Sequence, residues 1–526
     1  MNGFINFNKA PKSLKFAANQ NKNKLFTLIK KIISEDARVK WLLFAGLIIQ
    51  IITSITAVGA SSADQHFQII EFSLNQLGQP SGAPYVWEYD HFVRGTIQVY
   101  LFSGYHLVLN AIGITDPYTQ LTILRLILGL LMFAVFNLLA FHYFGNGNRE
   151  TLLFVLLLMN FSWVLPYTRT LFCAEMMCSL FFFGTLLLYE VKKEKWKRFW
   201  FPLVIGFLFS LAFYFRLQIA TALLGFGVWL LFFEKRYKHI LPIALGFGIG
   251  LLVNVLLDYG YYNIWIFTPY EYFKVNIIEG RATQFGTSSF WRYIGFIIFA
   301  APAPLFSIVL FYYGIKTFFK KYSNPIFLST LIFIIVHSMI GHKEERFMFP
   351  VLNVFPLIYG WSLPAVQQFY ENAKQWIRAF FRFLAWFTII LNSLLLLAIT
   401  FVPYSQTIRF SEKLKNKFHN QPVNLFTLGQ TPFQTPSRNP MVFYKNGAPE
   451  INIKRLSTID SVMMFNNEIE YLATTFNEIK DKRKTIDSLG YKPVMYSSDL
   501  LWAVNEMLNR KKINTINEIW VLYKKK

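Results

Sequence analysis

A dense group of ionisable residues lies between two apolar runs in the second half of this chain. The stretch reads Val336-His-Ser-Met-Ile-Gly-His-Lys-Glu-Glu-Arg-Phe-Met-Phe-Pro350, and its five residues from His342 to Arg346 are all ionisable. A charge at bilayer depth costs about 2.5 to 3.5 kcal/mol on insertion scales, so this group needs a membrane surface or a wet, protein-lined cavity. It is either a site or an ordinary solvated turn. Cytoplasmic turns are rich in Lys and Arg, whereas this group mixes both signs, which favours a site.

A second candidate for chemistry is Asp64, at the start of the stretch Ala63-Asp-Gln-His-Phe-Gln-Ile-Ile-Glu-Phe72. Apolar residues at helical spacing from Phe67 to Leu77 predict an amphipathic helix in the plane of the membrane interface. An Asp before such a pattern is most often a helix cap. Capping and acid–base chemistry are therefore both open for Asp64.

Aromatic and basic residues follow at the edges of other apolar runs. The stretch Pro84-Tyr-Val-Trp-Glu-Tyr-Asp90 and the nearby Arg94 offer flat rings for the apolar face of a sugar and a carboxylate, Glu88, for its hydroxyls. The rings alone would also fit an interfacial aromatic belt. Arg169, at the boundary of an apolar run, is either a snorkelling residue or an anion ligand.

The stretch His342-Lys-Glu-Glu-Arg-Phe347 resembles the HKE-x-RF signature of the Alg9-like and GPI mannosyltransferases, glycosyltransferase family 22 of the GT-C superfamily. Other segments repeat the resemblance in the same order along the chain: the region from Asp64 to Trp-Glu-Tyr89, Thr168-Arg-Thr with Glu175, Arg216, and Phe273-Lys-Val-Asn276 with Gln284-Phe-Gly-Thr287 and Trp291. Two departures are visible. Gln65 stands where the family usually has Glu, and Leu217-Gln-Ile219 replaces Pro-Thr-Ala after Arg216.

The resemblance implies a bacterial-type member of this family. Such an enzyme transfers a hexose from a polyprenyl-phosphate sugar to a glycan or lipid-linked acceptor, with inversion at the anomeric carbon. The family alone implies that the hexose is mannose. Asp64 is then the general base. The residues implied in substrate binding are Trp87, Glu88, Arg94, Arg169, Glu175, Arg216, Gln284, His342, Lys343, Glu344 and Arg346. No cofactor, metal or nucleic acid is expected, and the partners are the lipid-linked donor, the glycan or glycolipid acceptor and membrane lipid.

The chemistry of such a transfer accounts for these residue types. One carboxylate takes the proton of the acceptor hydroxyl, and a positioned general base typically contributes about 10² to 10⁴-fold. A leaving phosphate needs no protonation, so the second carboxylate that glycoside hydrolases use is unnecessary. It needs positive charge instead, which Arg169, Arg216, Lys343 and Arg346 can supply.

The composition is that of a polytopic α-helical membrane protein. Of the 526 residues, 54% are hydrophobic, 57 are Phe and only 15% are charged. The formal charge of +23 reflects basic loops between apolar runs and an anionic lipid surface rather than nucleic acid. The two cysteines, Cys173 and Cys178, imply no disulfide framework.

Apolar runs of membrane-spanning length set the predicted architecture. A basic segment at 1–40 predicts a cytoplasmic N-terminus, and about eleven spans of GT-C type follow. They lie near 41–58, 119–144, 150–167, 171–190, 200–215, 217–233, 239–258, 292–315, 323–340, 347–369 and 383–403. The predicted domains are therefore the cytoplasmic segment 1–40, a transmembrane catalytic domain at 41–410 with a large external loop at 59–118, and residues 411–526.

The distribution of Lys and Arg predicts the sidedness of the loops. If the spans alternate, the basic loops 145–149, 192–198, 235–238, 316–321 and 374–382 are cytoplasmic. All the candidate site residues then lie together on the extracytoplasmic face. The membrane is that of a bacterial cell, or alternatively the endoplasmic reticulum.

The segment 411–526 alternates between two patterns. Runs typical of strands occur at 424–428, 441–444, 461–465, 492–496 and 518–523, and helical patterns at 468–489 and 499–510. This alternation predicts a small α/β domain, which an odd number of spans places outside the cytoplasm.

Two rival functions follow from the same residues. In a transporter or flippase, intramembrane charges line a path instead of gathering on one face, and few such charges occur here apart from Asp258. A noncatalytic lipid-binding or assembly protein would keep its activity when Asp64 is substituted.

The predicted sidedness can be tested by labelling single cysteines in intact cells. In a chain whose Cys173 and Cys178 are replaced by Ser, we expect Thr287→Cys and Ser457→Cys to react with an impermeant maleimide and Lys195→Cys to be protected. Labelling at position 195 with protection at position 457 would contradict the one-sided site.

Overall fold

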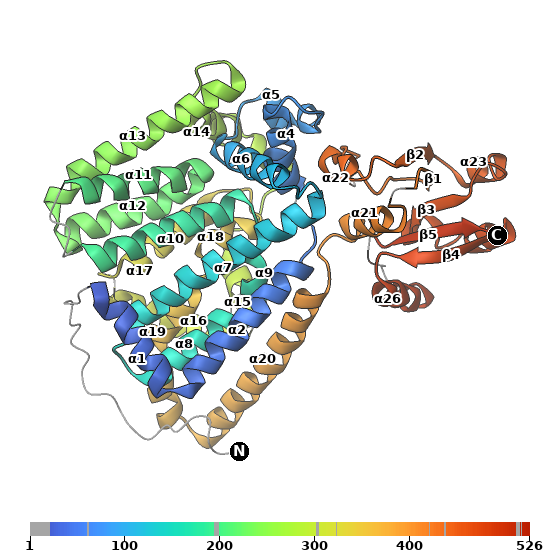
Figure 1. Cartoon of the computed structure of the whole chain (residues 1–526). Helices are drawn as coiled ribbons and strands as arrows, with labels where there is room; N and C mark the ends of the chain where they lie inside the picture. The colour runs from blue at the N-terminus through green and yellow to red at the C-terminus, as the bar shows by residue number, and fades with distance from the viewer. Residues whose placement is uncertain are drawn as a thin grey trace. The chain divides into compact units, whose positions relative to one another are not determined.

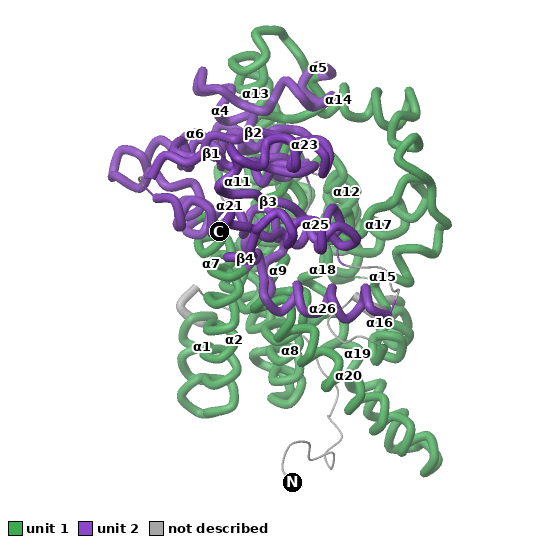
Figure 2. Tube along the Cα trace, turned by 90° about the vertical axis from the view of Figure 1, so that its right-hand side faces the viewer, with its two compact units in different colours: residues 1–56, 92–98, 124–401 green, residues 57–91, 99–123, 402–526 purple. Residues whose placement is uncertain are grey.

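The computed structural model describes residues 22–59, 63–193, 199–300, 305–321, 323–419, 421–435, 438–511, 516 and 518–526. The chain divides into two compact units (Figure 2). Unit 1 comprises residues 1–56, 92–98 and 124–401, and unit 2 comprises residues 57–91, 99–123 and 402–526. The basic residues predicted at 1–21 and at 195, 197 and 198 lie outside the described part of the chain.

Unit 1 is built from helices (Figure 1). Its long helices are α2 (Ala37–Thr56), most of α7 (Pro117–Phe144), α10 (Ala174–Lys192), α13 (Tyr237–Tyr262), α19 (Phe355–Asn372) and α20 (Gln375–Phe401). The shorter α-helices are α1 (Lys22–Glu35), α8 (Arg149–Phe161), α9 (Leu165–Thr168), α11 (Trp200–Phe215), α12 (Ala220–Val228), α14 (Thr268–Phe273), α15 (Arg292–Ala300), α16 (Ser307–Lys321), α17 (Pro325–Met339) and α18 (Phe349–Leu352). Single 3-10 or π turns are η3 (Leu217–Ile219), η4 (Trp229–Glu234), η5 (Lys274–Ile278), η6 (Arg281–Phe285) and η7 (Glu345–Met348).

Within the described residues, six helical segments are long and apolar enough to cross a membrane: Ala37–Thr56, Pro117–Phe144, Ala174–Lys192, Leu217–Glu234, Tyr237–Tyr262 and Gln375–Lys417. A seventh is the pair Glu345–Leu352 and Phe355–Asn372, which is bent by 68°. The apolar helices Trp200–Phe215 and Pro325–Met339 are shorter. Each of these segments coincides with a predicted apolar run, and the total of about eleven spans stays a prediction.

The long apolar tract at 200–233 is broken at the residue where the sequence predicted a division. Arg216 ends α11 in an extended conformation, with φ of −154° and ψ of 111°, and η3 begins at the next residue. The two helices α11 and α12 are therefore separate, and a charged residue lies at the break between them.

Helices α11 and α13 pack closely because glycines meet backbone at the crossing. A Cβ atom on Gly206 would lie 1.9 Å from the carbonyl oxygen of Ile243, and one on Gly246 would lie 1.9 Å from that of Leu203. Small residues at such crossings let two membrane helices approach at backbone distance. This contact positions the end of α11, where Arg216 lies.

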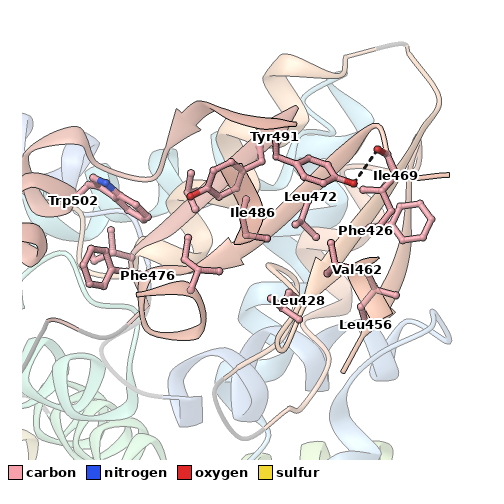
Figure 3. Close-up of a cluster of buried hydrophobic side chains, with 14 residues drawn as sticks. Phe426, Leu428, Leu456, Val462, Ile469, Leu472, Phe476, Ile486, Tyr491 and Trp502 are labelled. Carbon is pink, nitrogen blue, oxygen red and sulfur yellow. Dashed lines mark hydrogen bonds between the residues drawn. The ribbon is translucent and has the colours of Figure 1, made fainter. Parts of the chain in front are cut away.

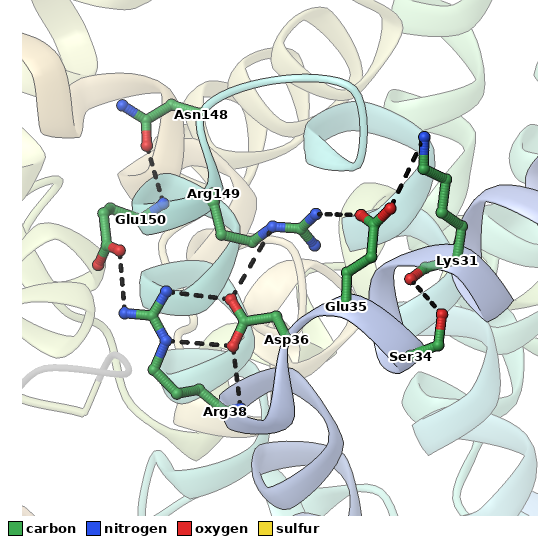
Figure 4. A network of polar contacts seen from close by, with 8 residues as sticks. All are labelled: Lys31, Ser34, Glu35, Asp36, Arg38, Asn148, Arg149 and Glu150. Carbon is green, nitrogen blue, oxygen red and sulfur yellow. Dashed lines mark hydrogen bonds and ion pairs between the residues drawn. The ribbon is translucent and has the colours of Figure 1, made fainter.

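Charged residues join the N-terminal helix to α8 at one end of unit 1 (Figure 4). Arg38 lies 3.0 Å from the carboxylates of both Asp36 and Glu150, and Arg149 lies 3.8 Å from Glu35. The hydrogen bond from the Arg38 guanidinium lowers the pKa of Asp36. This network fixes the turn between α1 and α2.

Unit 2 combines short helices of the 59–118 loop with the C-terminal segment. The loop contributes α3 (Ala63–Gln65), the π-helix η1 (His66–Glu71), α4 (Phe72–Gln76), η2 (Ala83–Tyr85), α5 (Trp87–Asp90) and most of α6 (Ile97–Ala111). Asp116 caps the start of α7 by accepting from the Thr119 N–H at 2.9 Å, and the Lys415 ammonium pairs with the same carboxylate. Lys415 lies in α21 (Gln406–Lys417), which contains the predicted boundary at 411.

A five-stranded sheet occupies the rest of unit 2. Its strands are β1 (Val423–Leu428), β2 (Ile451–Leu456), β3 (Tyr471–Thr475), β4 (Tyr491–Tyr496) and β5 (Trp520–Lys525), in the order β2-β1-β3-β5-β4. Only β5 runs antiparallel to its neighbours. Helices α22 (Val442–Asn446), α23 (Ile459–Met464), α24 (Phe476–Ile479), α25 (Arg483–Ser488) and α26 (Asp499–Arg510) lie in the connections. A buried cluster that includes Phe426, Leu472 and Trp502 packs between sheet and helices (Figure 3).

The structure confirms the strands predicted near 424–428, 492–496 and 518–523 and the helix predicted at 499–510. Three other predictions in this segment were wrong. The segment 461–465 lies largely in α23, because Thr458 caps that helix by accepting from the Ser461 N–H. The segment 441–444 begins α22, where Phe443 and Tyr444 are buried against other residues of unit 2. The predicted helix at 468–489 contains the central strand β3, since pairing with β1 and β5 overrides local propensity.

The close packing of α11 on α13 predicts different effects for two glycines of α13. We expect Gly246→Ala to lower stability by about 1 to 3 kcal/mol, because its new methyl group would force the helices apart. Gly248→Ala is the matched control, because no atom lies within 4 Å of its Cβ position, and Ala is the better helix former by about 1 kcal/mol. Thermal unfolding of both purified variants checks this. Equal melting temperatures would contradict the crossing.

Candidate active site

The ionisable stretch at 342–346 forms an ordered loop between α17 and η7. Ile340 ends α17 in an extended conformation. The loop is tied to the segment 286–288, since the Ser288 N–H donates to the Gly341 carbonyl at 2.9 Å and the His342 Nδ1 lies 3.0 Å from the Gly286 carbonyl oxygen. Gly286 has a φ of +98°, which side chains rarely tolerate. The stretch is therefore held in place rather than being an ordinary solvated turn.

Glu344 is the centre of the polar contacts within this loop. Its two carboxylate oxygens accept from Arg346 Nε at 2.6 Å and Nη2 at 3.1 Å, a bidentate pair. The His342 Nε2 also lies 3.1 Å from Glu344 Oε1. Both ring nitrogens of His342 therefore lie within hydrogen-bonding distance of an oxygen atom.

Glu175 connects this loop to two other parts of unit 1. Its carboxylate lies 3.2 Å from Arg216 Nη2 and 3.9 Å from Arg346 Nε. Glu175 is buried in the first turn of α10, where the positive end of the helix dipole favours a carboxylate. The structure thus brings together five of the predicted site residues: Glu175, Arg216, His342, Glu344 and Arg346.

Arg216 is positioned by the break between α11 and η3. Its Nε donates to the Gln218 side-chain oxygen, and its guanidinium carbon lies 5.1 Å from the centre of the Phe347 ring. Gln218 is one of the residues that departs from the Pro-Thr-Ala pattern, and the structure gives it a role. It holds the arginine two residues before it.

Lys343 lies beside this group but points its ammonium at backbone. Its side chain is 6% exposed, and its Nζ donates to the carbonyl oxygens of Ser288, at 3.1 Å, and Ile340. Burial lowers the pKa of Lys343. Two of its three N–H donors are therefore engaged in holding the loop to the 286–288 segment.

Arg169 is deeply buried and is not a snorkelling residue. It is 1% exposed, its Nε donates to Asn353 Oδ1 at 2.7 Å, and its Nη2 donates to the Met159 carbonyl at 2.8 Å. Asn353 was not among the predicted residues. An amide side chain inside the apolar run 347–369 was the signal that could have identified it.

Arg94 lies in a short segment that a buried carboxylate holds in unit 1. Both the N–H and the hydroxyl of Thr96 donate to Asp258 Oδ1, at 2.9 and 2.8 Å, and the Thr268 hydroxyl donates to Oδ2 at 2.7 Å. The Arg94 guanidinium lies 5.5 Å from the centre of the Tyr272 ring. Asp258 thus positions the segment that contains Arg94 and Thr96. The sequence showed only that Asp258 lies near the end of an apolar run, which did not indicate this role.

Gln284 lies in η6 and is exposed, two residues before the anchoring Gly286. Its neighbour Phe285 has its ring centre 6.1 Å from that of His342. Gln284 therefore borders the loop at 342–346 but is not one of the ion-paired residues described above.

The remaining predicted residues belong to unit 2. Asp64 is the second residue of α3 and is half-buried. Glu88, in the first turn of α5, is buried and accepts from Gln68 Nε2 at 3.0 Å. The Trp87 ring packs edge-on against His91, with centres 5.6 Å apart. Unit 2 thus joins the start of the 59–118 loop to its Trp-Glu-Tyr stretch.

No group of three or more His, Cys, Asp or Glu side chains suited to a metal ion occurs among the residues that the structure describes. Cys173 and Cys178 are both buried thiols.

The sequence profile of the Alg9-like mannosyltransferase family matches residues 41–441. This chain belongs to that family. GPI mannosyltransferase 3 of Debaryomyces hansenii is 24% identical over 263 residues, which cover 48% of this chain and 46% of the relative. GPI alpha-1,2-mannosyltransferase 3 of Bos taurus is 24% identical, covering 57% of this chain and 53% of the relative. The chain thus spans about half the length of the curated relatives it matches.

The fold of this family member is similar to that of ArnT, a GT-C glycosyltransferase. The crystal structure of ArnT from Cupriavidus metallidurans bound to undecaprenyl phosphate superposes with a TM-score of 0.51 and 10% sequence identity. The likeness covers 92% of this chain and 97% of ArnT. The chain is therefore a multi-pass membrane protein with a GT-C-type fold.

Proposed function

We propose that this chain transfers mannose from a polyprenyl-phosphate mannose to a glycan or lipid-linked acceptor, with inversion, on the extracytoplasmic face of its membrane. Family membership over residues 41–441 is the observation that carries this proposal. The relatives are GPI mannosyltransferases, which supports a mannosyl transfer, and ArnT binds undecaprenyl phosphate, which supports a polyprenyl-phosphate carrier. We place the enzyme in a bacterial cell membrane, with the endoplasmic reticulum as the alternative.

In the proposed reaction the acceptor hydroxyl oxygen attacks the anomeric carbon of the mannosyl phosphate. The bond between that carbon and the phosphate oxygen breaks, and the proton of the hydroxyl passes to the carboxylate of Asp64. The polyprenyl phosphate leaves with both electrons of the broken bond and gains negative charge. Cations placed where that charge develops stabilise the transition state.

Arg216 and Arg346 are the cations that we assign to the phosphate. Both are paired with carboxylates in the structure, and the two partners differ in exposure. The Glu175 side chain is 3% exposed, whereas that of Glu344 is 35% exposed. Glu344 is therefore the partner that a phosphate can replace on Arg346, while Glu175 keeps both guanidinium groups in place. Arg169, with two donors engaged by Asn353 and Met159, supports the site from within the helices.

The transporter interpretation is less favoured by this arrangement. Glu175, Arg216, Glu344 and Arg346 pair with one another at helix breaks, and the family is one of transferases. A path for a lipid-linked sugar would instead need charges distributed along its length.

The assignment of Arg346 can be tested against a surface arginine of the same region. We expect Arg346→Ala to lower kcat/KM for the phosphate-linked donor by about 10² or more, because one of the charges facing the leaving group is lost. Arg292→Ala is the matched control, since Arg292 pairs with the exposed Glu345 and such pairs contribute little. Transfer assays on both purified variants give the comparison. An equal loss of protein yield and activity in Arg346→Ala would indicate a structural ion pair.

The assignment of Asp64 is tested by an isosteric change. Asp64→Asn keeps the size of the side chain and caps a helix about as well, but removes its basicity. We expect turnover to fall by roughly 10² to 10⁴ with donor binding retained. Asp90→Asn, at an exposed position of α5, is the control.

The assay uses undecaprenyl-phosphate mannose and dolichyl-phosphate mannose in parallel. The donor that the enzyme uses also distinguishes the two proposed membranes. Near-wild-type transfer by Asp64→Asn would exclude Asp64 as the base and leave Glu88 or Glu344.

A further inference from the structure

A fully buried carboxylate lies in the 59–118 loop, five residues after a buried histidine. Glu71 Oε1 lies 2.8 Å from His66 Nε2, and both side chains are almost completely inaccessible to solvent. The two residues begin and end the π-helix η1. In an α-helix, residues five apart lie about 140° apart around the axis, so their side chains diverge. The wider π turn brings them to one side, and such turns are frequent at functional sites.

The same carboxylate binds two backbone amides from different parts of unit 2. The Gly82 N–H donates to Glu71 Oε2 at 2.7 Å, and the Phe443 N–H donates to Oε1 at 3.0 Å. Gly82 lies later in the loop, and Phe443 lies in α22 of the C-terminal segment. Glu71 thus joins η1 to a later part of the same loop and to α22, which lies 372 residues further along the chain.

Aromatic packing reinforces this connection. The His66 ring stacks on the ring of Tyr444, with centres 5.3 Å apart and an angle of 12° between the planes. The Phe443 ring packs edge-on against Phe102 of α6 at 5.7 Å. A Cβ atom on Gly82 would lie 2.5 Å from the Pro440 carbonyl oxygen, so the loop also approaches the C-terminal segment at backbone distance there.

These contacts lie directly beside Asp64. Residues 63–65 form α3, a helix of three residues that η1 continues without a break. So short a helix has no stability of its own, because forming the first turn of a helix is unfavourable. The direction of α3 therefore depends on how η1 is held.

We propose that Glu71 is a positioning residue for transfer, through which α22 of the C-terminal segment holds the helical turn that carries Asp64. This inference rests on the proposed function, in which Asp64 is the base. It gives the segment 402–526 a part in the reaction. Asp64 takes the proton, and Glu71, His66 and Tyr444 keep its carboxylate in the productive position.

The test compares single and double variants of the full-length purified enzyme. The donor is tritium-labelled undecaprenyl-phosphate or dolichyl-phosphate mannose, whichever the wild type uses, and the acceptor is the total glycolipid extract of the source cells. Glu71→Gln keeps the size of the side chain but has only one accepting oxygen. The donors of His66, Gly82 and Phe443 are arranged around two carboxylate oxygens, so at least one of them loses its acceptor. We expect kcat to fall by about 10- to 100-fold, as misplacement of a catalytic group does, with the donor KM within about twofold of wild type.

The double variant separates positioning from general loss of structure. If Glu71 acts through Asp64, Asp64→Asn combined with Glu71→Gln has the same kcat as Asp64→Asn alone, because a missing base gains nothing from being positioned. Glu468→Gln, at an exposed position of unit 2, is the control and keeps wild-type kinetics. If Glu71→Gln does not accumulate, Tyr444→Leu replaces it in both the single and the double variant, because it removes the stacking and keeps the three hydrogen bonds.

The outcomes distinguish this inference from the proposed function. Wild-type kinetics for Glu71→Gln, or a further loss in the double variant, would overturn the role of Glu71 and leave Asp64 as the base. If Tyr444→Leu is used instead, wild-type kinetics of that variant, or a further loss when it is combined with Asp64→Asn, would likewise overturn the positioning role. Near-wild-type transfer by Asp64→Asn would overturn the proposed base and, with it, the positioning role.

Discussion

The charged part of unit 1 depends on Glu175, the carboxylate that two arginines share. Arg216 and Arg346 come from parts of the chain more than a hundred residues apart, and each would be costly to bury alone. Breaking a buried ion pair by removing one partner costs about 3 to 5 kcal/mol, because it leaves a charge uncompensated. At the start of α10, Glu175 compensates both charges and fixes the distance between them. In the proposed reaction the phosphate reaches this pair of guanidinium groups on its more exposed side, where Glu344 lies.

Helix breaks are the feature that makes this possible in an apolar chain. Arg216 follows α11, and Arg169 follows α9 shortly before α10, whose second residue is Glu175. Glu344 and Arg346 lie between α17 and α18. Non-helical backbone at membrane depth is tolerated only where protein or a water-filled cavity satisfies its polar groups. The loops at 286–288 and 340–346 satisfy part of each other's main chain, because the Ser288 N–H donates to the Gly341 carbonyl and the His342 and Lys343 side chains contact the carbonyl oxygens of Gly286 and Ser288. The break at Arg216 leaves α11 with 16 residues, and α17, which ends before the 340–346 loop, has 15, so both are short apolar helices.

The sequence predicted the positions of the long helices and the break at Arg216, because apolar runs and isolated charges are local signals. It also identified the residues that pair around Glu175 and Glu344 in unit 1. It did not reveal which carboxylate pairs with which cation, or that Lys343 binds backbone carbonyls, since these contacts join segments far apart in the chain. In the C-terminal segment, the runs 441–444 and 461–465 contain β-prone residues but form helices. Burial of Phe443 and Tyr444 among distant residues of unit 2 accompanies the first helix, which a local pattern does not reveal. The Thr458 cap begins the second, and this was a local signal that the β-prone residues after it outweighed.

In the described part of the 59–118 loop, short main-chain segments are held by hydrogen bonds to buried acids. Two fully buried carboxylates do this, one in each unit. Asp258 accepts three hydrogen bonds that fix the segment around Arg94, and Glu71 accepts three that fix the segment around His66. In both cases most of the donors are backbone N–H or hydroxyl groups. Each carboxylate therefore fixes the position of the main chain near its donors rather than neutralising a cation. A buried acid with all its donors in place is costly to disrupt. Each acid thus fixes main chain close in sequence to a predicted site residue, since His66 follows Asp64 by two residues and Thr96 follows Arg94 by two.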